Sequence, residues 1–197
     1  MTTAAARASG RPRNPELDSA ILAAAEQQFR ELGYARMSLE AVAAAAGTSV
    51  PSVRRRFLSK AGLASAVIGS LRIADLPAAA GPPRARALAI LANFHDNLQR
   101  PGSLAVVGTL LAEEQRHPEL LGIFRSRLVE PRRVRLRQAL ADGIEAGELP
   151  QSADPEALAS MLIGSFYARY VAASAIPDDW AERMLQQAWP ERPVRGH

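Results

Sequence analysis

The sequence contains no cysteine and only three histidines. Without cysteine the chain can form no disulfide and offers no thiolate to a metal ion or a redox centre. The histidines are His95, His117 and His197, and no two of them lie close in the sequence. A metal site built on histidine would need partners from distant segments, so we predict no metal and no cofactor.

Long apolar runs are also absent. No segment approaches the roughly 18 consecutive apolar residues that span a bilayer, and MTTAAARASGRPRN has no apolar stretch like that of a secretory signal. We therefore expect a cytoplasmic protein with no membrane partner. The sequence also offers no nucleophile and base at a recognisable spacing, which argues against an enzyme.

The charge of the chain is unevenly distributed. Hydrophobic residues make up 48% and charged residues 22% of its 197 residues, a globular composition. The net charge of +4 lies in residues 1–76, with ten basic and six acidic side chains, whereas the other 14 basic and 14 acidic side chains balance. A module that binds a polyanion, joined to a neutral domain, has this distribution. A basic surface that faces only solvent is the alternative.

Apolar residues recur at helical spacing along the chain, and we find no convincing strand pair. Helices are predicted from Pro15 to Gly33, from Leu39 to Ala46 after the capping residue Ser38, from a cap at Thr48 or Ser49, and from a cap at Ser59 to about Ile73. Further helical patterns cover 84–99, 103–116, 118–146, 155–175 and 178–189. The prediction is an all-α fold of about nine helices.

Two of these helices meet at a glycine-containing turn in AVAAAAGTSVPSVRRRFLSK, residues 41–60. Small Ala43 would let them cross closely, and the inward-facing residues would be Val42, Ala46, Val53 and Phe57, which predicts a helix-turn-helix. The second helix of that motif enters the major groove of DNA. Its exposed face would carry Ser49, Ser52, Arg55 and Arg56, with Arg54 at the flank. Consecutive arginines point in different directions, so at least one must contact phosphate. An arginine-rich helix without a ligand is the alternative.

The segment 16–68 resembles the DNA-binding region of the TetR-type bacterial transcriptional repressors. The matching positions of its first two helices are Ile21, Ala24, Ala25, Phe29, Gly33, Ser38, Val42, Ala43, Ala46 and Gly47. Those that follow are Ser49, Phe57, Ser59, Lys60 and Leu63. Beyond residue 68 the resemblance is one of helix pattern. It implies a ligand-responsive transcriptional repressor that binds palindromic, double-stranded operator DNA and is released from it by a small apolar molecule.

The resemblance also implies roles for single residues. Val50, Pro51, Arg54 and Arg55 would approach base edges, while Ser52, Arg56 and Lys60 would approach phosphates. The family usually has tyrosine in place of Arg54 and often histidine in place of Arg56. Because arginine pairs with guanine O6 and N7, we expect guanine in the operator, although Arg54 could serve a phosphate instead. The predicted DNA-binding residues are Ser38, Ser49, Val50, Pro51, Ser52, Arg54, Arg55, Arg56 and Lys60, with Arg11 and Arg13 in the minor groove or in a plain flexible terminus.

Three prolines and a glycine in DLPAAAGPPR, residues 75–84, mark a domain boundary or a sharp connection. We expect a flexible basic arm at 1–14, a DNA-binding domain at 15–60, a connecting helix at 61–76, and a ligand-binding and dimerisation domain at 77–197. The alternative is an all-α module for protein interaction or small-molecule binding, without a DNA function.

By analogy with the family, the C-terminal domain should bind a small apolar or aromatic effector. The predicted lining is Phe94, Leu98, Leu110, Phe124, Phe166, Tyr167 and Tyr170, and the alternative is that these residues only build the core. We expect His95, Asp96 and Asn97 at the surface, with His95 and Asp96 on different sides of a helix. The last two helices carry apolar stripes that predict a homodimer through Leu158, Leu162, Ser165, Trp180 and Met184. Completion of an intramolecular core is the other explanation of these stripes.

Overall fold

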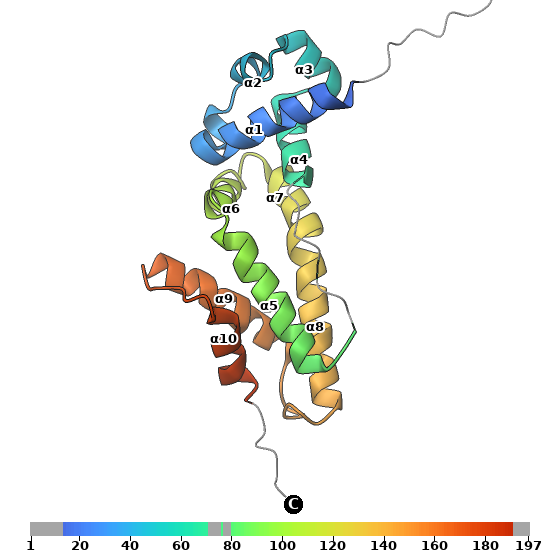
Figure 1. Ribbon diagram of the computed structural model, residues 1–197, viewed down its shortest axis with the longest axis vertical. Coiled ribbons are helices and arrows are strands. Elements are labelled where there is room, and N and C mark those ends of the chain that lie inside the picture. Colours follow the sequence, from blue (N-terminus) through green and yellow to red (C-terminus); the bar gives the residue numbers. More distant parts are fainter. Residues whose placement is uncertain (1–13, 71–75, 77–79, 191–197) are drawn as a thin grey trace, which may run out of the picture. The chain divides into compact units, whose positions relative to one another are not determined.

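The computed structural model describes residues 14–70, 76 and 80–190 (Figure 1). All regular structure in these residues is helical, which confirms the predicted all-α class. The helices are α1 (Pro15–Arg36), α2 (Leu39–Ala45), α3 (Val50–Phe57), α4 (Lys60–Ser70), α5 (Pro83–Gln99), α6 (Ser103–Ala112), α7 (Pro118–Phe124), α8 (Glu130–Glu145), α9 (Pro155–Val171) and α10 (Trp180–Ala188), with a π-helical segment, η1 (Arg125–Val129), between α7 and α8. None of the described helices is both long and apolar enough to cross a membrane.

The chain divides into two compact units, Met1–Val67 and Ile68–His197. The division falls within α4, inside the segment 61–76 that we expected to connect two domains. The first unit holds α1, α2, α3 and most of α4, and the second holds the remaining helices.

The core of the N-terminal unit is built on α1. Asn14 Oδ1 accepts a hydrogen bond from the backbone N–H of Glu16 at 2.9 Å, and so satisfies one of the amide groups that a helix N-terminus leaves open. Three apolar residues at every fourth position are fully buried: Ile21, Ala25 and Phe29. At Gly33 the helical conformation breaks with φ 74°, which glycine adopts without steric cost. The apolar face of α1 therefore follows the predicted spacing, and the break occurs at the predicted glycine.

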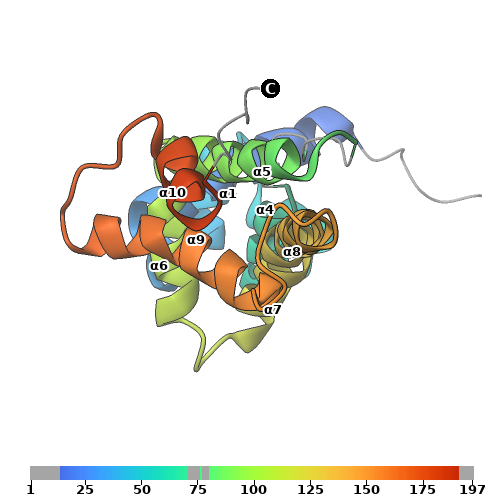
Figure 2. The same ribbon diagram turned by 90° about the horizontal axis from the view of Figure 1, so that it is seen from below.

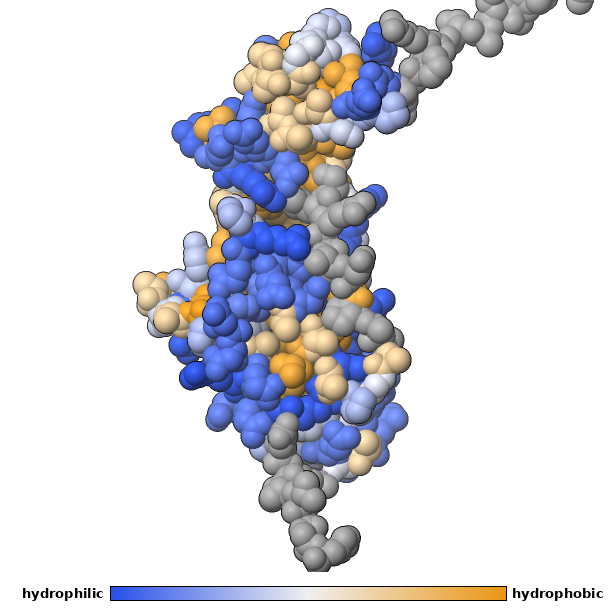
Figure 3. Space-filling view, in the orientation of Figure 1, coloured by the Kyte–Doolittle hydropathy of each residue, from blue (hydrophilic) through white to orange (hydrophobic). Residues whose placement is uncertain are grey.

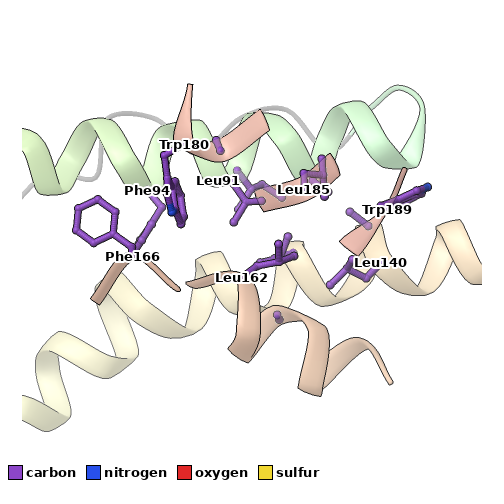
Figure 4. Close-up of a cluster of buried hydrophobic side chains, with 14 of the residues drawn as sticks. Leu91, Phe94, Leu140, Leu162, Phe166, Trp180, Leu185 and Trp189 are labelled. Atoms are coloured by element: carbon purple, nitrogen blue, oxygen red, sulfur yellow. The ribbon is translucent and has the colours of Figure 1, made fainter. Parts of the chain in front are cut away.

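The core of the C-terminal unit lies between α5, α8, α9 and α10 (Figures 2 and 4). α5 packs along α8, and α10 packs against α5 and α9. Large side chains fill the space between these helices, among them Leu91, Phe94, Leu140, Leu162, Phe166, Trp180, Leu185 and Trp189. The Trp189 ring lies so close to Gly143 of α8 that a Cβ there would be 2.2 Å from ring atom Cη2. The packing of Trp189 therefore requires glycine at this position of α8.

Residues 118–146, predicted as one helix, form α7, η1 and α8. Pro131 stands in the first turn of α8, and proline has no N–H with which to continue the hydrogen bonds of a preceding helix. The wider π-helical turn directly before it accommodates the break. The apolar spacing of the sequence does not reveal this change of helix type.

Hydrophilic side chains cover most of the visible face of the C-terminal unit (Figure 3). Among the described residues of this unit, the exposed large apolar side chains are Leu111, Val134, Met161, Tyr170 and Val171. Met161 and Val171 lie toward one side of α9, which its own unit does not cover, whereas Tyr170 lies on the opposite side of the helix.

Candidate nucleic-acid interface

The cap, the turn and the packed residues of α2 and α3 are largely those that the sequence predicts. Ser38 Oγ caps α2 by accepting a hydrogen bond from the backbone N–H of Ala41 at 3.1 Å. Gly47 has φ 62°, a left-handed conformation that costs glycine little. Three residues are buried where α2 and α3 pack: Val42, Ala43 and Val53. Ala46 and Phe57, also predicted to face inward, are half-buried. The segment is therefore a helix-turn-helix with α3 as its second helix.

The three consecutive arginines of α3 have different surroundings. Arg54 and Arg55 are exposed. Arg56, predicted on the exposed face, points instead to α1, where its Nε lies 2.8 Å from Asp18 Oδ1 and only 11% of its side chain is exposed. Arg56 follows the buried Val53 by three residues and so lies on nearly the same side of α3. This corrects its predicted exposure.

Asp18 is a residue that sequence analysis missed. It stands in the first turn of α1, where an acidic side chain is common because it interacts favourably with the helix dipole. The local pattern explains its presence without a partner, and no spacing rule connects it to Arg56. The ion pair between them joins the first turn of α1 to the last turn of α3.

The N-terminal turn of α3 presents short side chains. Ser49 precedes the helix, and its hydroxyl makes no capping hydrogen bond. Ser49 and Pro51 are exposed, and Val50 and Ser52 are half-buried. Backbone amides at a helix N-terminus attract anions, and these side chains are too short to keep a phosphate away from them. This end of α3 therefore suits a contact with the DNA backbone.

Lys60 is fixed beside the end of α1. Its Nζ donates a hydrogen bond to the carbonyl oxygen of Ala35 at 2.9 Å, and it lies 4.6 Å from the centroid of the Tyr34 ring. An ammonium group has three N–H donors, so Lys60 keeps donors for a second acceptor. Its position depends on α1, although it belongs to the first turn of α4.

A tight turn joins α3 to α4. Leu58 has φ 64° and ψ −53°, and the backbone N–H of Ser59 donates to the carbonyl oxygen of Phe57 at 2.7 Å. This is a γ-turn, which is strained for a leucine. A Cβ on Gly62 would lie 2.1 Å from the same carbonyl oxygen, while Ser59 Oγ accepts from the Gly62 N–H at 3.0 Å, as predicted for a cap. α3 thus ends abruptly at Phe57, and α4 begins at once.

Two further predictions concern the DNA contacts of Arg11 and Arg13 and the absence of a metal site. Arg11 and Arg13, expected either in the minor groove or in a plain flexible terminus, lie outside the described residues. Within residues 14–70, 76 and 80–190 no group of histidine, aspartate and glutamate could hold a metal ion.

Part of the predicted effector lining gathers in the C-terminal core. Phe94 of α5 meets Phe166 of α9 with ring centroids 5.4 Å apart, and Tyr167 lies 5.9 Å from both rings. Leu98 packs against the same cluster. Leu110 on α6, Phe124 on α7 and the 53% exposed Tyr170 are not members of it. The structure therefore brings four of the seven predicted residues together.

A surface depression beside α10 is lined by other residues. Arg169, Trp180, Arg183 and Met184 contribute to its wall. None of the seven residues predicted for an effector lines this depression. The predicted site and the depression are separate features of the C-terminal unit.

His95 is buried rather than exposed. Its side chain stacks on Trp180, with ring centroids 6.0 Å apart and 15° between the planes, and the residue is 6% exposed. His95 Nδ1 also lies 3.4 Å from Asp96 Oδ1, so the two adjacent side chains do meet. The burial of His95 and its contact with Asp96 correct the prediction, whereas Asp96 is exposed as predicted and Asn97 is half-buried. His95 follows the buried Leu91 by four residues, which places it on the core side of α5.

The predicted dimer residues lie largely in the core of their own chain. Trp180 is 0% and Leu162 3% exposed, and both belong to the hydrophobic cluster. Leu158, Ser165 and Met184 are half-buried. This corrects the predicted availability of Leu162 and Trp180 to a partner. The exposed side of α9 carries instead Ala157, Ser160, Met161, Gly164, Ala168 and Val171.

Both units match known families of proteins. The family described as bacterial regulatory proteins, tetR family, matches residues 21–67. The family described as tetracyclin repressor-like, C-terminal domain, matches residues 77–188. The chain is similar to the HTH-type transcriptional regulator Rv1556 of Mycobacterium tuberculosis, with 27% identity over 191 residues that cover 90% of this chain and 89% of the relative. It is 24% identical to the HTH-type transcriptional regulator YdeS of Bacillus subtilis over 184 residues, which cover 91% of each chain.

Solved structures share the fold. The structure titled flavonoid-responsive regulator FrrA has a TM-score of 0.65 and 24% identity, and the match covers 90% of this chain and 99% of that one. The fatty acid degradation regulator FadR from Bacillus halodurans has a TM-score of 0.65 and 19% identity, with 90% and 96% covered. At these identities the likeness shows a common arrangement of helices.

Proposed function

The chain belongs to the tetR family of bacterial regulatory proteins, and on this premise we propose that it is a repressor that binds a palindromic operator and leaves it when a small effector binds. As a member of this family it is a transcriptional regulator with a helix-turn-helix DNA-binding domain, and it is not an enzyme. The observation that supports the proposal most directly is that Arg54 and Arg55 are exposed on α3. The ion pair between Arg56 and Asp18 holds the other face of this helix against α1.

Arg54 and Arg55 are the residues that we propose to meet the DNA first. Both are exposed, and an arginine side chain can donate two hydrogen bonds to guanine O6 and N7. We assign base reading to Arg55 and either a base or a phosphate to Arg54. Ser52 and Lys60 would contact phosphates. Arg56 is engaged with Asp18, so we assign it the role of positioning α3 rather than a phosphate contact.

A two-fold dimer is proposed through the exposed side of α9. Met161 and Val171 supply exposed apolar surface there. No atom lies within 4 Å of the place where a Cβ on Gly164 would stand, so a second helix can approach closely. Exposed apolar surface of this kind marks an interface. A dimer of this symmetry carries two copies of α3 and matches a palindrome with half-sites about 34 Å apart or more.

The effector is proposed to bind beside the cluster of Phe94, Leu98, Phe166 and Tyr167. These residues are the members of the predicted lining that the core brings together. The similarly folded FrrA is described as responsive to flavonoids, which are aromatic molecules, and this supports an apolar or aromatic effector here. Such a molecule can release the DNA only if it binds one arrangement of the protein more tightly than another.

Operator binding tests the DNA-reading part of the proposal. The probe is labelled DNA from the region upstream of the protein's own reading frame, titrated by fluorescence anisotropy at several salt concentrations. Arg55→Ala should weaken specific binding by about 1–3 kcal/mol and relax the preference at one base pair, whereas Lys60→Ala should weaken binding to all sequences alike. A base-by-base profile that is the same for the wild type and Arg55→Ala would rule out base reading by Arg55. Affinity that does not fall with salt would rule out the phosphate contacts.

A screen of small aromatic molecules tests the effector part. Molecules that bind the protein should lower its affinity for the same DNA. If they bind and leave that affinity unchanged, the sensor function fails while the DNA-reading function stands.

A further inference from the structure

Arg132 of α8 is the one buried arginine in the part of the chain that the structure describes. It is 8% exposed. Two other arginines of the C-terminal unit with little-exposed side chains each have a carboxylate partner: Arg84 pairs with Glu182, and Arg86 with Asp142. Arg132 has no carboxylate within ion-pair distance among the described residues. It is therefore the most buried of these charges and the one that lacks a counter-charge.

The contacts of Arg132 satisfy only part of its guanidinium. Nη1 donates to the backbone carbonyl of Leu128 at 3.4 Å, and Nη2 donates to Asn93 Oδ1 at 3.3 Å. Nε is buried without a hydrogen-bond partner. A guanidinium has five N–H donors, and both of these bonds are long. The group therefore has unused donors in a place that water does not freely reach.

The groups around Arg132 are those of a binding site for an amphipathic molecule. Its Cζ lies 5.5 Å from the centroid of the Phe94 ring, and this ring contacts the rings of Phe166 and Tyr167. Asn93 and Tyr167 are half-buried beside these rings. A few polar groups that converge within an apolar surrounding are typical of small-molecule sites.

The electrostatic state of the site favours an anion. Burial lowers the pKa of the Arg132 guanidinium below its ordinary value, but arginine remains protonated in proteins. Burial raises the pKa of the Tyr167 hydroxyl above its ordinary value, so Tyr167 stays neutral and can donate a hydrogen bond. The chain thus supplies one positive charge and a neutral donor, and no described carboxylate competes for the charge.

We propose that Arg132 binds the acidic group of the effector, so that the effector is an anion with an aromatic or other apolar body rather than a neutral apolar molecule. This inference rests on the effector response proposed above and adds the chemical class of the effector. An anionic group would complete the hydrogen bonding of the guanidinium and balance its charge. The apolar body would lie against Phe94, Phe166 and Tyr167.

Two fluorescent probes separate charge from apolar bulk. The dye 8-anilinonaphthalene-1-sulfonate carries a sulfonate, whereas N-phenyl-1-naphthylamine has the same ring system without it. Because hydrogen bonds to a charged group are stronger than those between neutral groups, the wild type should bind the sulfonate about 10-fold to 100-fold more tightly than the neutral dye. Arg132→Met should remove this preference and leave the affinity for the neutral dye unchanged.

Two further variants control for fold and charge. Arg132→Lys keeps a cation and should retain a preference for the sulfonate. Arg86→Met removes an arginine that is paired with Asp142, and it should leave the preference as in the wild type. Arg132→Met should also keep its melting temperature or raise it, because apolar replacement of an unpaired buried charge is neutral or stabilising. If Arg132→Met fails to fold, Arg132→Gln takes its place. It removes the charge but keeps an N–H donor for Leu128 or Asn93, and it should lose the sulfonate preference that Arg86→Met retains.

The outcomes separate this inference from the function on which it rests. If the wild type binds both dyes equally and the neutral dye releases the DNA, the effector response stands and the anionic class is wrong. If neither dye binds or affects DNA affinity, the proposed effector site itself is overturned. A sulfonate preference that persists unchanged in Arg132→Met places the anion at another residue and also overturns the inference.

Discussion

The contact between Gly143 and Trp189 predicts a large effect from a single methyl group. A Cβ on Gly143 would lie 2.2 Å from Cη2 and 2.4 Å from Cζ2 of the indole, far inside van der Waals contact. Trp189 cannot yield easily, because it is 2% exposed and its carbonyl accepts a hydrogen bond from Arg84 Nε at 3.3 Å. Overpacking of this kind costs about 1–3 kcal/mol, and alanine recovers about 1 kcal/mol through its helix propensity. We expect Gly143→Ala to lower the free energy of unfolding by up to about 2 kcal/mol.

Urea unfolding followed by tryptophan fluorescence measures this effect. The chain has two tryptophans, and Trp180 and Trp189 both lie in the C-terminal core, so the signal reports this unit. Gly108→Ala is the matched control, because a Cβ at this exposed position of α6 meets no atom within 4 Å. The control should be more stable than the wild type by up to about 1 kcal/mol. If Gly143→Ala gains stability as the control does, Trp189 does not pack on α8 as described.

Three further changes test other contacts. Asp18→Asn removes the partly exposed ion pair with Arg56. It should lower the stability of the N-terminal unit by about 1 kcal/mol and weaken binding to all DNA sequences alike. An unchanged DNA affinity would show that α3 does not need this ion pair to hold its position. Gly62→Ala places a Cβ 2.1 Å from the Phe57 carbonyl oxygen. Hydrogen exchange should then show that the backbone amides of α3 and α4 lose protection. Protection equal to that of the wild type would contradict the tight turn. The hydrogen bond from Arg86 lowers the pKa of Asp142 below its ordinary 3.8. The ionised carboxylate therefore stabilises the fold at neutral pH, and this contribution is lost as pH falls through the lowered pKa. The melting temperature of Asp142→Asn should fall less steeply than that of the wild type at acid pH.

Local chemistry made part of the fold predictable. Gly33, Ser38 and Gly47 act through their own backbone angles or through amides a few residues away, so the sequence around each of them is sufficient. The same holds for Val42 and Val53, whose burial follows from helical spacing. The all-α class and the helix-turn-helix depend on such short-range features.

Long-range packing was not predictable in the same way. Arg56 looks like its neighbours Arg54 and Arg55 in the sequence, and only the position of α1 brings Asp18 to it. The apolar faces of α9 and α10 could serve a partner chain or their own core, and spacing cannot distinguish the two. In the structure, Leu162 and Trp180 are buried in the core of their own chain. Arg132 is one arginine of a strongly charged segment, and its burial becomes visible only when α5 and α9 are in place.

The abrupt end of α3 at Leu58 limits how much DNA sequence this helix can specify. Its eight residues extend about 12 Å at 1.5 Å per residue, which is about the width of the major groove. Base pairs stack about 3.4 Å apart, so one α3 can face about four of them. In a two-fold dimer the directly read sequence is then about eight base pairs, which recurs by chance about once in 65,000 base pairs. Against the 10⁶ or more competing sites of a genome, α3 alone would select tens of places. Recognition of a single promoter therefore needs further information, either from contacts outside α3 or from the sequence-dependent shape and stiffness of the operator.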